Sequence, residues 1–533
     1  MGVQVLDCTL RDGGYINNWE FGKHTICSIL DKLESSGIDI IECGFLTSRP
    51  RGEDCSLFGS PREIAPLLPQ RKSNAMFVAM IAIGEKELPP DRLPAREPGS
   101  IHGIRLTFHR EETEQAMAWA GAIMAKGYHV FLQPVGTAFY SDLELLRLVE
   151  RVNQLKPFAF YIVDTLGSMY RNQVTRQFHL IDENMDPSVR LGFHGHNNLQ
   201  LAFSNAQVLS TIQAKRDLIV DSSVYGMGRG AGNLPTELIT RYINKNIQSR
   251  YNVAMVMDVY DEYIAPLRKE YEWGYTMAYQ IAAIHACHPN YAAYLLNKQT
   301  LTMTDIESIL RSIPQHQRVE FDKELIRELY QRYQSKGIDD SKAVEELSAL
   351  MQGRKLLVLA PGQSLRIRES QVMEFIRRQA PFVIAVNFAD PKFQVEACFV
   401  SNHKRLDIAG GQMRSLPGVR RIFTSNLAPY GDEGCFYVDY DRCANEDPMV
   451  SDNAGLMLLK LLERCGAKKV YLAGFDGFRG KEGSSYYNRP AFLPYSSAEA
   501  FERQRRMKEQ LGKLSLELVF VTPSAYEEKE GIR

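Results

Sequence analysis

Eight short apolar runs recur along the first 225 residues, separated by stretches with helical periodicity. The runs begin near residues 3, 38, 75, 103, 128, 159, 189 and 218. Their spacing of about 31 residues is the length of one strand–helix–strand unit. The intervening stretches, such as HTICSILDKLESSG and SDLELLRLVERVNQLK, read as amphipathic helices. Strands that are apolar throughout suit a parallel sheet covered by helices, so the pattern predicts a (β/α)8 barrel in an α/β protein. An open doubly wound sheet is the alternative.

The remainder of the chain changes character twice. Residues 241–350 are helical in pattern and rich in tyrosine and charge, which predicts a helical extension over the barrel mouth or at a subunit interface. Apolar runs resume at 355–360, 382–387, 395–400, 420–424, 468–474 and 517–522, alternating with helical stretches. This alternation predicts a doubly wound α/β domain. The predicted domains are a barrel over 1–240, the extension over 241–350 and the α/β domain over 351–533.

Composition narrows the class of protein. Lys and Arg total 63 against 64 for Asp and Glu, so no overall field attracts nucleic acid. We find no apolar run of the roughly 18 residues that span a bilayer. The N-terminus has acidic and glycine residues where a signal peptide needs an apolar core. The nine cysteines form no C-x-x-C motif, which favours reduced, mostly buried thiols. We therefore expect a cytoplasmic protein.

Polar side chains follow the predicted barrel strands at the end where such barrels carry their active sites. Arg11 and Asp12 come after the first strand, Glu42 ends the second, and His194 and His196 end the seventh. Residues i and i+2 of a strand point the same way, so both imidazoles can reach one metal ion, with Asp12 as third ligand. This donor set suits Zn, Mn, Co, Fe or Mg. Two hydrogen-bonded histidines on a loop are the alternative.

Two further features adjoin this predicted metal site. The guanidinium of Arg11 suits a carboxylate or enolate oxygen, so it would hold a 2-oxo acid that chelates the metal. An ordinary ion pair with Asp12 is the alternative. The glycine-rich run GMGRGAGN ends in Asn233. The amide oxygen of Asn233 either reaches the metal or caps the helix that begins at LPTE.

Three motifs, LDCTLRDGG, FHGHNN and SVYGMGRGAGNLPTE, together resemble the metal-dependent carbon–carbon lyases with an aldolase-type TIM barrel. That superfamily includes 4-hydroxy-2-oxovalerate aldolase, 3-hydroxy-3-methylglutaryl-CoA lyase, isopropylmalate synthase and homocitrate synthase. The resemblance covers residues 1–300. It implies Asp12, His194 and His196 as ligands of a divalent metal, joined by Asn233 in the lyase and synthase branches. It also implies Arg11 as the group that steadies an enolate.

The chain departs from the superfamily pattern at two places. Its glycine-rich loop lacks the cysteine of the CoA lyases, which favours the hydroxy-oxo-acid aldolases. Tyr15 stands where those aldolases carry a histidine base, and a phenol is a poor base at neutral pH. The resemblance also implies a catalytic tyrosine over the site, for which Tyr275 is the match. His285 and His288 are further candidates, with helix capping or packing as their alternative, and Glu42 is a candidate at the second strand.

The C-terminal run LLVLAPGQSL is a strand followed by a Gly–Ser turn whose amides suit a phosphate. With VIAVNF, YLAGFDGF and GSSYYN, it resembles bacterial sialyltransferase-like and related nucleotide-sugar domains over residues 353–490. The resemblance implies Gly362, Ser364, Asn387 and Asp476 around a nucleotide. His403 is a poor match to the histidine base of the transferases, so nucleotide binding without group transfer and group transfer itself are equal alternatives. A plain α/β domain without a ligand is the alternative.

These patterns leave three functions open. The first is an aldolase or lyase for a 2-oxo acid such as pyruvate, fused to a nucleotide-sugar-binding domain. That pairing suggests synthesis of a surface-glycan precursor by a homo-oligomer. The second is a Claisen-type acyl-CoA condensing enzyme on the same barrel. The third is a non-catalytic barrel with a C-terminal glycosyltransferase or sugar-nucleotide-binding domain.

Overall fold

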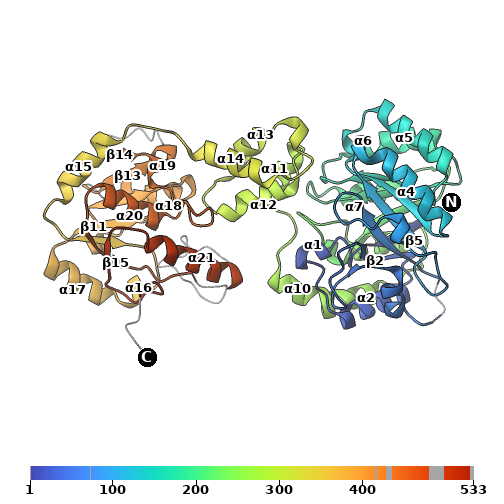
Figure 1. Ribbon diagram of the computed structural model, residues 1–533, viewed down its shortest axis with the longest axis horizontal. Coiled ribbons are helices and arrows are strands. Elements are labelled where there is room, and N and C mark those ends of the chain that lie inside the picture. Colours follow the sequence, from blue (N-terminus) through green and yellow to red (C-terminus); the bar gives the residue numbers. More distant parts are fainter. Residues whose placement is uncertain are drawn as a thin grey trace. The chain divides into compact units, whose positions relative to one another are not determined.

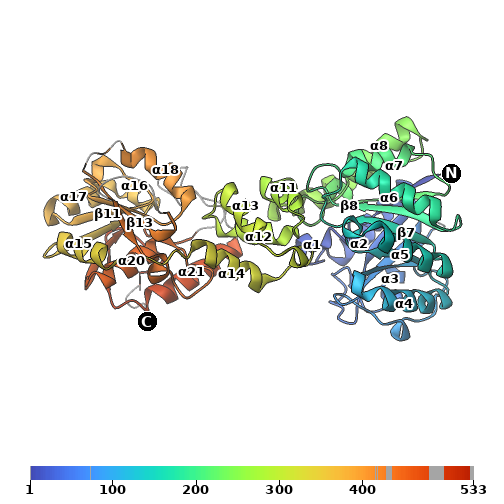
Figure 2. The ribbon, with the colours of Figure 1, turned by 90° about the horizontal axis from the view of Figure 1, so that it is seen from above.

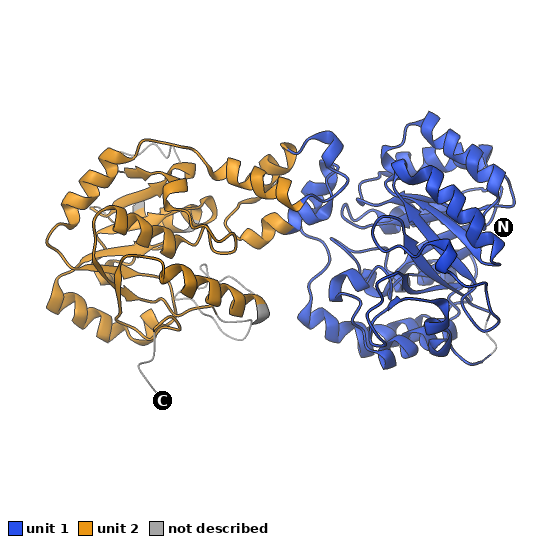
Figure 3. Ribbon diagram, viewed as in Figure 1, with its two compact units in different colours: residues 1–293, 313–322 blue, residues 294–312, 323–533 orange. Residues whose placement is uncertain are grey.

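The computed structural model describes residues 2–71, 74–414, 416, 418–427, 435–478 and 497–527. The chain divides into two compact units (Figure 3). Residues 1–293 and 313–322 form unit 1, and residues 294–312 and 323–533 form unit 2. The helical stretch expected over 241–350 is thus shared between the units. The GSSYYN motif lies outside the described residues.

Unit 1 contains a closed barrel of eight parallel strands. The strands pair in the order β1-β9-β8-β7-β6-β5-β4-β2, and β1 also pairs with β2 through Leu6 with Ile40 and Asp7 with Ile41. This last pairing closes the ring, so the barrel prediction is confirmed and the open-sheet alternative is wrong. The barrel strands are β1 (Val3–Asp7), β2 (Ile40–Leu46), β4 (Met76–Ala82), β5 (Gly103–Phe108), β6 (His129–Pro134), β7 (Ala159–Asp164), β8 (Arg190–Gly195) and β9 (Leu218–Ser222). A two-residue strand, β3 (Leu57–Phe58), pairs beside β2.

Helices surround the barrel, as Figures 1 and 2 show. Helix α2 buries Ile26, Ile29 and Leu33 at helical spacing, and this apolar stripe packs in the same core as the outward-facing strand residues. The helices of unit 1 are α1 (Gly14–Asn17), α2 (Lys23–Ser35), α3 (Pro61–Ile64), α4 (Thr113–Ala125), α5 (Asp142–Leu155), α6 (Arg171–Asn184), α7 (Ala202–Thr211), α8 (Thr236–Asn246), α9 (Val253–Val259), α10 (Ala265–Glu270) and α11 (Met277–Ile284). Loops, rather than helices, lie at the carboxyl ends of the strands, and these loops carry the candidate site.

Unit 2 contains a seven-stranded parallel sheet with the order β14-β13-β12-β11-β10-β15-β16. The strands are β10 (Leu356–Leu359), β11 (Phe382–Val386), β12 (Ala397–Val400), β13 (Arg420–Thr424), β14 (Cys435–Val438), β15 (Lys469–Ala473) and β16 (Glu517–Phe520). The predicted α/β fold is confirmed, with β14 as a strand that the sequence pattern missed. The strand order reverses between β10 and β15, and such a reversal opens a crevice at the carboxyl ends of the strands.

Helices also accompany the sheet of unit 2. They are α13 (Met303–Arg311), α14 (Lys323–Gln334), α15 (Ser341–Met351), α16 (Ser364–Ile367), α17 (Glu369–Gln379), α18 (His403–Arg414), α19 (Tyr440–Cys443), α20 (Ala454–Arg464) and α21 (Ser497–Leu511), while α12 (Pro289–Lys298) contains residues of both units. Among the described residues, we find no helix that is long and apolar enough to cross a membrane. All nine cysteines are free and seven are buried, as their sequence context predicts.

Candidate active site

Asp12, His194 and His196 meet at the carboxyl ends of the barrel strands. Asp12 follows β1, and the two histidines flank Gly195 at the end of β8. One ligand atom from each lies within 4.8 Å of the others, and all three residues are buried. Within the part of the chain that the structure describes, this is the only such cluster of His, Cys, Asp and Glu. The donors that the sequence singled out therefore reach a common point.

The glycine-rich loop after β9 closes over Asp12. A Cβ atom on Gly228 would lie 2.7 Å from Oδ2 of Asp12 and 2.3 Å from Nδ2 of Asn233. Only glycine leaves room for this approach, which explains a glycine there. The Asn233 amide nitrogen donates to Oδ2 of Asp12 and, at 3.1 Å, to the carbonyl of Met227. The Asn233 amide oxygen is buried and has no partner.

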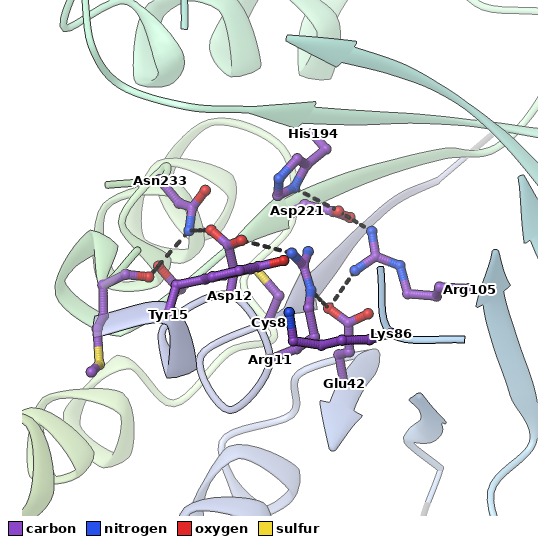
Figure 4. A network of polar contacts seen from close by, with 12 residues as sticks. Cys8, Arg11, Asp12, Tyr15, Glu42, Lys86, Arg105, His194, Asp221 and Asn233 are labelled. Atoms are coloured by element: carbon purple, nitrogen blue, oxygen red, sulfur yellow. Dashed lines mark hydrogen bonds and ion pairs between the residues drawn. The ribbon is translucent and has the colours of Figure 1, made fainter. Parts of the chain in front are cut away.

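Arg11 links the carboxylate of Asp12 to the interior of the barrel (Figure 4). Its Nη1 donates to Asp12 Oδ1 at 2.7 Å, and its Nε donates to Oε2 of Glu42, on β2, at 2.8 Å. Its Nη2 is buried without a hydrogen-bond partner. Two of the three guanidinium nitrogens are therefore held by carboxylates, and the third is available to a ligand.

A second buried arginine continues this network toward His194 (Figure 4). Nη1 of Arg105, on β5, donates to Oε2 of Glu42 at 2.6 Å, and its Nη2 contacts Oδ2 of Asp221, on β9. Oδ2 of Asp221 also lies 3.0 Å from Nδ1 of His194. A carboxylate that accepts a hydrogen bond from one ring nitrogen of a histidine orients the other ring nitrogen toward a metal. Nε2 of His194 is thus the nitrogen that remains for coordination.

The protonation states suit metal coordination. Burial lowers the pKa of His196 to about 3, which keeps its imidazole neutral. Burial alone would raise the pKa of Asp12, but the positive charge of Arg11 holds it below its ordinary value. A neutral imidazole and an ionised carboxylate are the forms that bind metal ions.

The buried charges also fit a divalent cation. Three carboxylates, those of Asp12, Glu42 and Asp221, face two guanidiniums, those of Arg11 and Arg105. The network therefore carries one more negative than positive group in a buried setting, where an uncompensated charge is costly. A mixed set of imidazole and carboxylate donors suits Mn, Co, Zn or Fe and accepts Mg. The residues present therefore fit the predicted metal.

A cavity of about 540 Å³ opens beside the cluster. Its lining includes Arg11, His194, His196 and His288, together with three residues at or just after the ends of β5, β6 and β7: His109, Gln133 and Thr165. Tyr15 also lines the cavity, and its hydroxyl donates to Glu85 at 3.1 Å. Burial raises the pKa of Tyr15 above its ordinary value, so the phenol holds its proton at neutral pH.

Two predicted catalytic residues have other positions. Glu42 is 1% exposed and is not among the cavity-lining residues, so it positions the two arginines rather than touching a ligand. Tyr275 is 53% exposed, and its hydroxyl donates to Gln280 at 3.1 Å. Thr276 caps α11 by accepting from the Tyr279 backbone, which leaves Tyr275 outside the first turn. The structure therefore does not place Tyr275 over the site.

The sequence pattern missed Arg105 and Asp221 as parts of the site, whereas His288, one of the further candidates, does line the cavity. Arg105 and Asp221 are single charged residues inside otherwise apolar strands, GIRLTF and LIVDSS. A charge buried on a strand needs a partner, and that was the available signal.

The four predicted nucleotide-binding residues of unit 2 are close together. Gly362, Asn387 and Asp476 line one cleft at the carboxyl ends of β10, β11 and β15. Ser364 does not line this cleft. Its backbone N–H donates to Oδ2 of Asp476 at 2.7 Å, and its hydroxyl contacts the same carboxylate. The amide that was expected for a phosphate therefore already binds a side chain.

Comparison with known proteins finds sequence relatives that are named as aldolases. Residues 111–262 match the model of the HMGL-like family. The 4-hydroxy-2-oxovalerate aldolase of Thermomicrobium roseum is 27% identical over 302 residues, covering 54% of this chain and 81% of the relative. The 4-hydroxy-2-oxovalerate aldolase 2 of Comamonas testosteroni is 23% identical over 274 residues, covering 50% of this chain and 75% of the relative. The HMG-CoA lyase structure from Bacillus subtilis matches with a TM-score of 0.41 and 15% identity, covering 50% and 94%.

The closed barrel and the sequence relatives support the aldolase TIM-barrel superfamily for unit 1. The sialyltransferase-like resemblance of the C-terminal domain stays a prediction.

Proposed function

We propose that unit 1 is a divalent-metal-dependent carbon–carbon lyase of the aldolase type, acting on a 2-oxo acid. The observation that carries the proposal is the cluster of Asp12, His194 and His196, whose ligand atoms lie within 4.8 Å of one another beside a cavity. Relatives named 4-hydroxy-2-oxovalerate aldolase support the same reaction class.

The residues of the chain divide the work of such a reaction. Asp12, His194 and His196 would hold the metal, which when bound polarises the keto oxygen and stabilises the enolate that forms as the C–C bond breaks. Nη2 of Arg11, which has no protein partner, donates to a carboxylate or enolate oxygen of the substrate. Glu42 and Asp12 fix the guanidinium through Nε and Nη1.

Metal binding tests this proposal directly. We expect the full-length wild-type protein to bind one Mn²⁺ per chain in calorimetric titration, and Asp12→Asn and His196→Gln to lose that binding because each removes a ligand. His179→Gln is the matched control, since His179 is exposed on α6. Cleavage of 4-hydroxy-2-oxovalerate, followed as pyruvate release, is expected to require the ion. Absence of Mn²⁺ binding and of any metal-dependent cleavage in the wild type would rule out the proposal.

We also propose a nucleotide or nucleotide-sugar site in the cleft of unit 2. Support comes from the reversal of strand order between β10 and β15 and from Asn387 at the end of β11. Asn387 has a φ of 63°, and its buried amide oxygen lacks a partner. A role in surface-glycan precursor synthesis rests on this second proposal.

Thermal unfolding tests the cleft of unit 2. A ligand that binds only the folded state at 100 times its dissociation constant stabilises it by about 2.7 kcal/mol. We expect CMP, UDP or a sugar linked to either to raise the unfolding temperature of the wild type. Asn387→Ala is expected to abolish that shift, whereas the exposed Asp339→Asn is expected to keep it. Equal unfolding temperatures with and without every nucleotide would contradict a nucleotide site.

A further inference from the structure

His288 borders the cavity of unit 1 from a segment outside the barrel. It directly precedes α12, is 8% exposed, and lines the same cavity as Arg11, His194 and His196. Its backbone N–H donates to the carbonyl of Arg318 at 2.7 Å. The residue is therefore fixed in the wall of the proposed active site, yet the metal cluster and the Arg11 network do not use it.

The glycine-rich loop fixes where this segment lies. Gly230 has a φ of +63°, and a Cβ atom there would lie 3.2 Å from Cβ of Pro289 and 2.7 Å from Oδ1 of Asn198. The carbonyl of Gly230 also accepts from the backbone N–H of Gly274 at 3.2 Å. The start of α12 thus packs against the loop that also encloses Asp12, which holds the His288 ring on the cavity side.

The hydrogen bonds of the His288 ring determine its tautomer. The backbone N–H of Asn290 donates to Nδ1 at 3.1 Å, so Nδ1 is an acceptor and the proton of the neutral ring is on Nε2. Among the described residues, we find no hydrogen-bond partner for Nε2. A second proton on Nδ1 would place two N–H groups against each other. The neutral ring therefore presents an N–H donor to the cavity.

The electrostatic setting agrees with this tautomer. Burial and, after it, the charge of Arg229 lower the pKa of His288 well below its ordinary value. Other ring-bearing polar groups of the cavity wall already have acidic partners. Tyr15 donates to Glu85, and Nδ1 of His109 lies 3.4 Å from Glu320 with the His109 side chain 38% exposed. The neutral donor of His288 therefore remains available to a substrate, as does the side-chain amide of Gln133, whose Nε2 is buried in the same wall without a partner.

We propose that His288 is a further catalytic residue, whose neutral Nε2–H donates to the oxygen on the carbon that is attacked by the enolate. This inference rests on the proposed aldolase function. In condensation, the enolate carbon bonds to the carbonyl carbon, and the C=O π electron pair moves to the oxygen that Nε2–H contacts. In cleavage, that alkoxide re-forms the C=O bond while the C–C pair returns to the enolate. The ring stays neutral throughout. In condensation, solvent water gives the alkoxide its proton. In cleavage, water takes the hydroxyl proton before the C–C bond breaks and afterwards protonates the enolate carbon.

The location of this oxygen separates two half-reactions. Enolisation of pyruvate involves the metal ligands and Arg11, but no oxygen on an attacked carbon is present. Cleavage of 4-hydroxy-2-oxovalerate involves the metal ligands, Arg11 and this additional oxygen. A donor for the second oxygen therefore affects cleavage and leaves enolisation unchanged, whereas a general packing defect affects both.

The experiment compares His288→Ala, His288→Gln and the control His285→Gln in the full-length protein. His285 ends α11 and does not line the cavity. The readouts are Mn²⁺ affinity, exchange of the pyruvate methyl protons in D₂O followed by NMR, and kcat for 4-hydroxy-2-oxovalerate cleavage. We expect His288→Ala to keep Mn²⁺ affinity and exchange within about twofold and to lower kcat by about 10²-fold, the effect of removing one oxyanion donor.

His288→Gln is expected to recover part of the cleavage rate because its amide N–H also donates. Nitrogen-15 NMR is expected to show His288 as the neutral Nε2–H tautomer between pH 6 and 8. Any of three results would overturn this inference alone: a wild-type cleavage rate in His288→Ala, an equal loss of exchange and cleavage in that variant, or a charged His288 at pH 6. A wild-type protein with neither exchange nor cleavage overturns the proposed function, and this inference with it.

Discussion

Arg11→Met is expected to lower kcat for cleavage of 4-hydroxy-2-oxovalerate by about 10²–10³-fold, the loss that follows removal of one preorganised donor to an oxyanion. Nη2 of Arg11 is a charged, buried donor of the cavity wall without a protein partner, while Nη1 and Nε are held by Asp12 and Glu42. This fixed geometry means that the guanidinium need not reorganise when charge develops on the substrate.

Two further variants define the cause of that loss. Arg11→Lys retains the charge but not the fork of three nitrogens, so we expect most of the defect to remain. Arg110→Met is the matched control, because Arg110 lies near the cavity but is exposed and pairs with Glu144. Mn²⁺ affinity and unfolding temperature are measured in parallel. A kcat for Arg11→Met within threefold of the wild type would show that Arg11 has no role in the reaction.

Arg105→Met is expected to reduce the free energy of unfolding of unit 1 by about 3–5 kcal/mol, the range for breaking a buried ion pair by removing one partner. The side chains of Arg105 and Glu42 are fully buried and that of Asp221 is 1% exposed. The variant leaves both carboxylates without this counter-charge. Tryptophan fluorescence during urea unfolding measures the effect, because the three tryptophans, Trp19, Trp119 and Trp273, all belong to unit 1.

A triple variant separates charge from packing in that experiment. Glu42→Gln and Asp221→Asn, added to Arg105→Met, remove both negative charges, so we expect much of the lost stability to return. Arg151→Met is the surface control, because the exposed Arg151 pairs with the exposed Glu114, and its effect is expected to be below about 0.5 kcal/mol. A free energy of unfolding for Arg105→Met equal to that of the wild type would mean that the ion-pair network does not stabilise unit 1.

The sequence predicted the barrel well because its strands are buried on both faces. Such strands appear as nearly continuous apolar runs, and each predicted run lies within two residues of the start of an observed strand. The strands that were missed are short. β3 has two residues, and β14 is the four-residue segment CFYV, which gives too few positions for a periodicity to emerge.

The candidate site was predictable in part. Asp12, His194 and His196 stood out because their residue types and strand-end positions satisfy a metal on their own. Arg105 and Asp221 did not, because their roles depend on which strands become neighbours across the closed barrel. Tyr275 and His288 show a different limit. They lie in one helical segment, and the cap at Thr276 and the contact of Pro289 with Gly230 decide which of them faces the cavity.

The charged network draws its members from five different strands or strand ends, those of β1, β2, β5, β8 and β9. Neighbouring ion pairs in the network share a carboxylate or a guanidinium. Mutation of a single member therefore leaves the charge of its neighbour buried without a partner. Evolutionary drift at these positions is therefore expected to be concerted. Homologues that lack Arg105 should also have lost an acid at position 42 or 221, and lineages should differ by paired exchanges rather than by isolated ones.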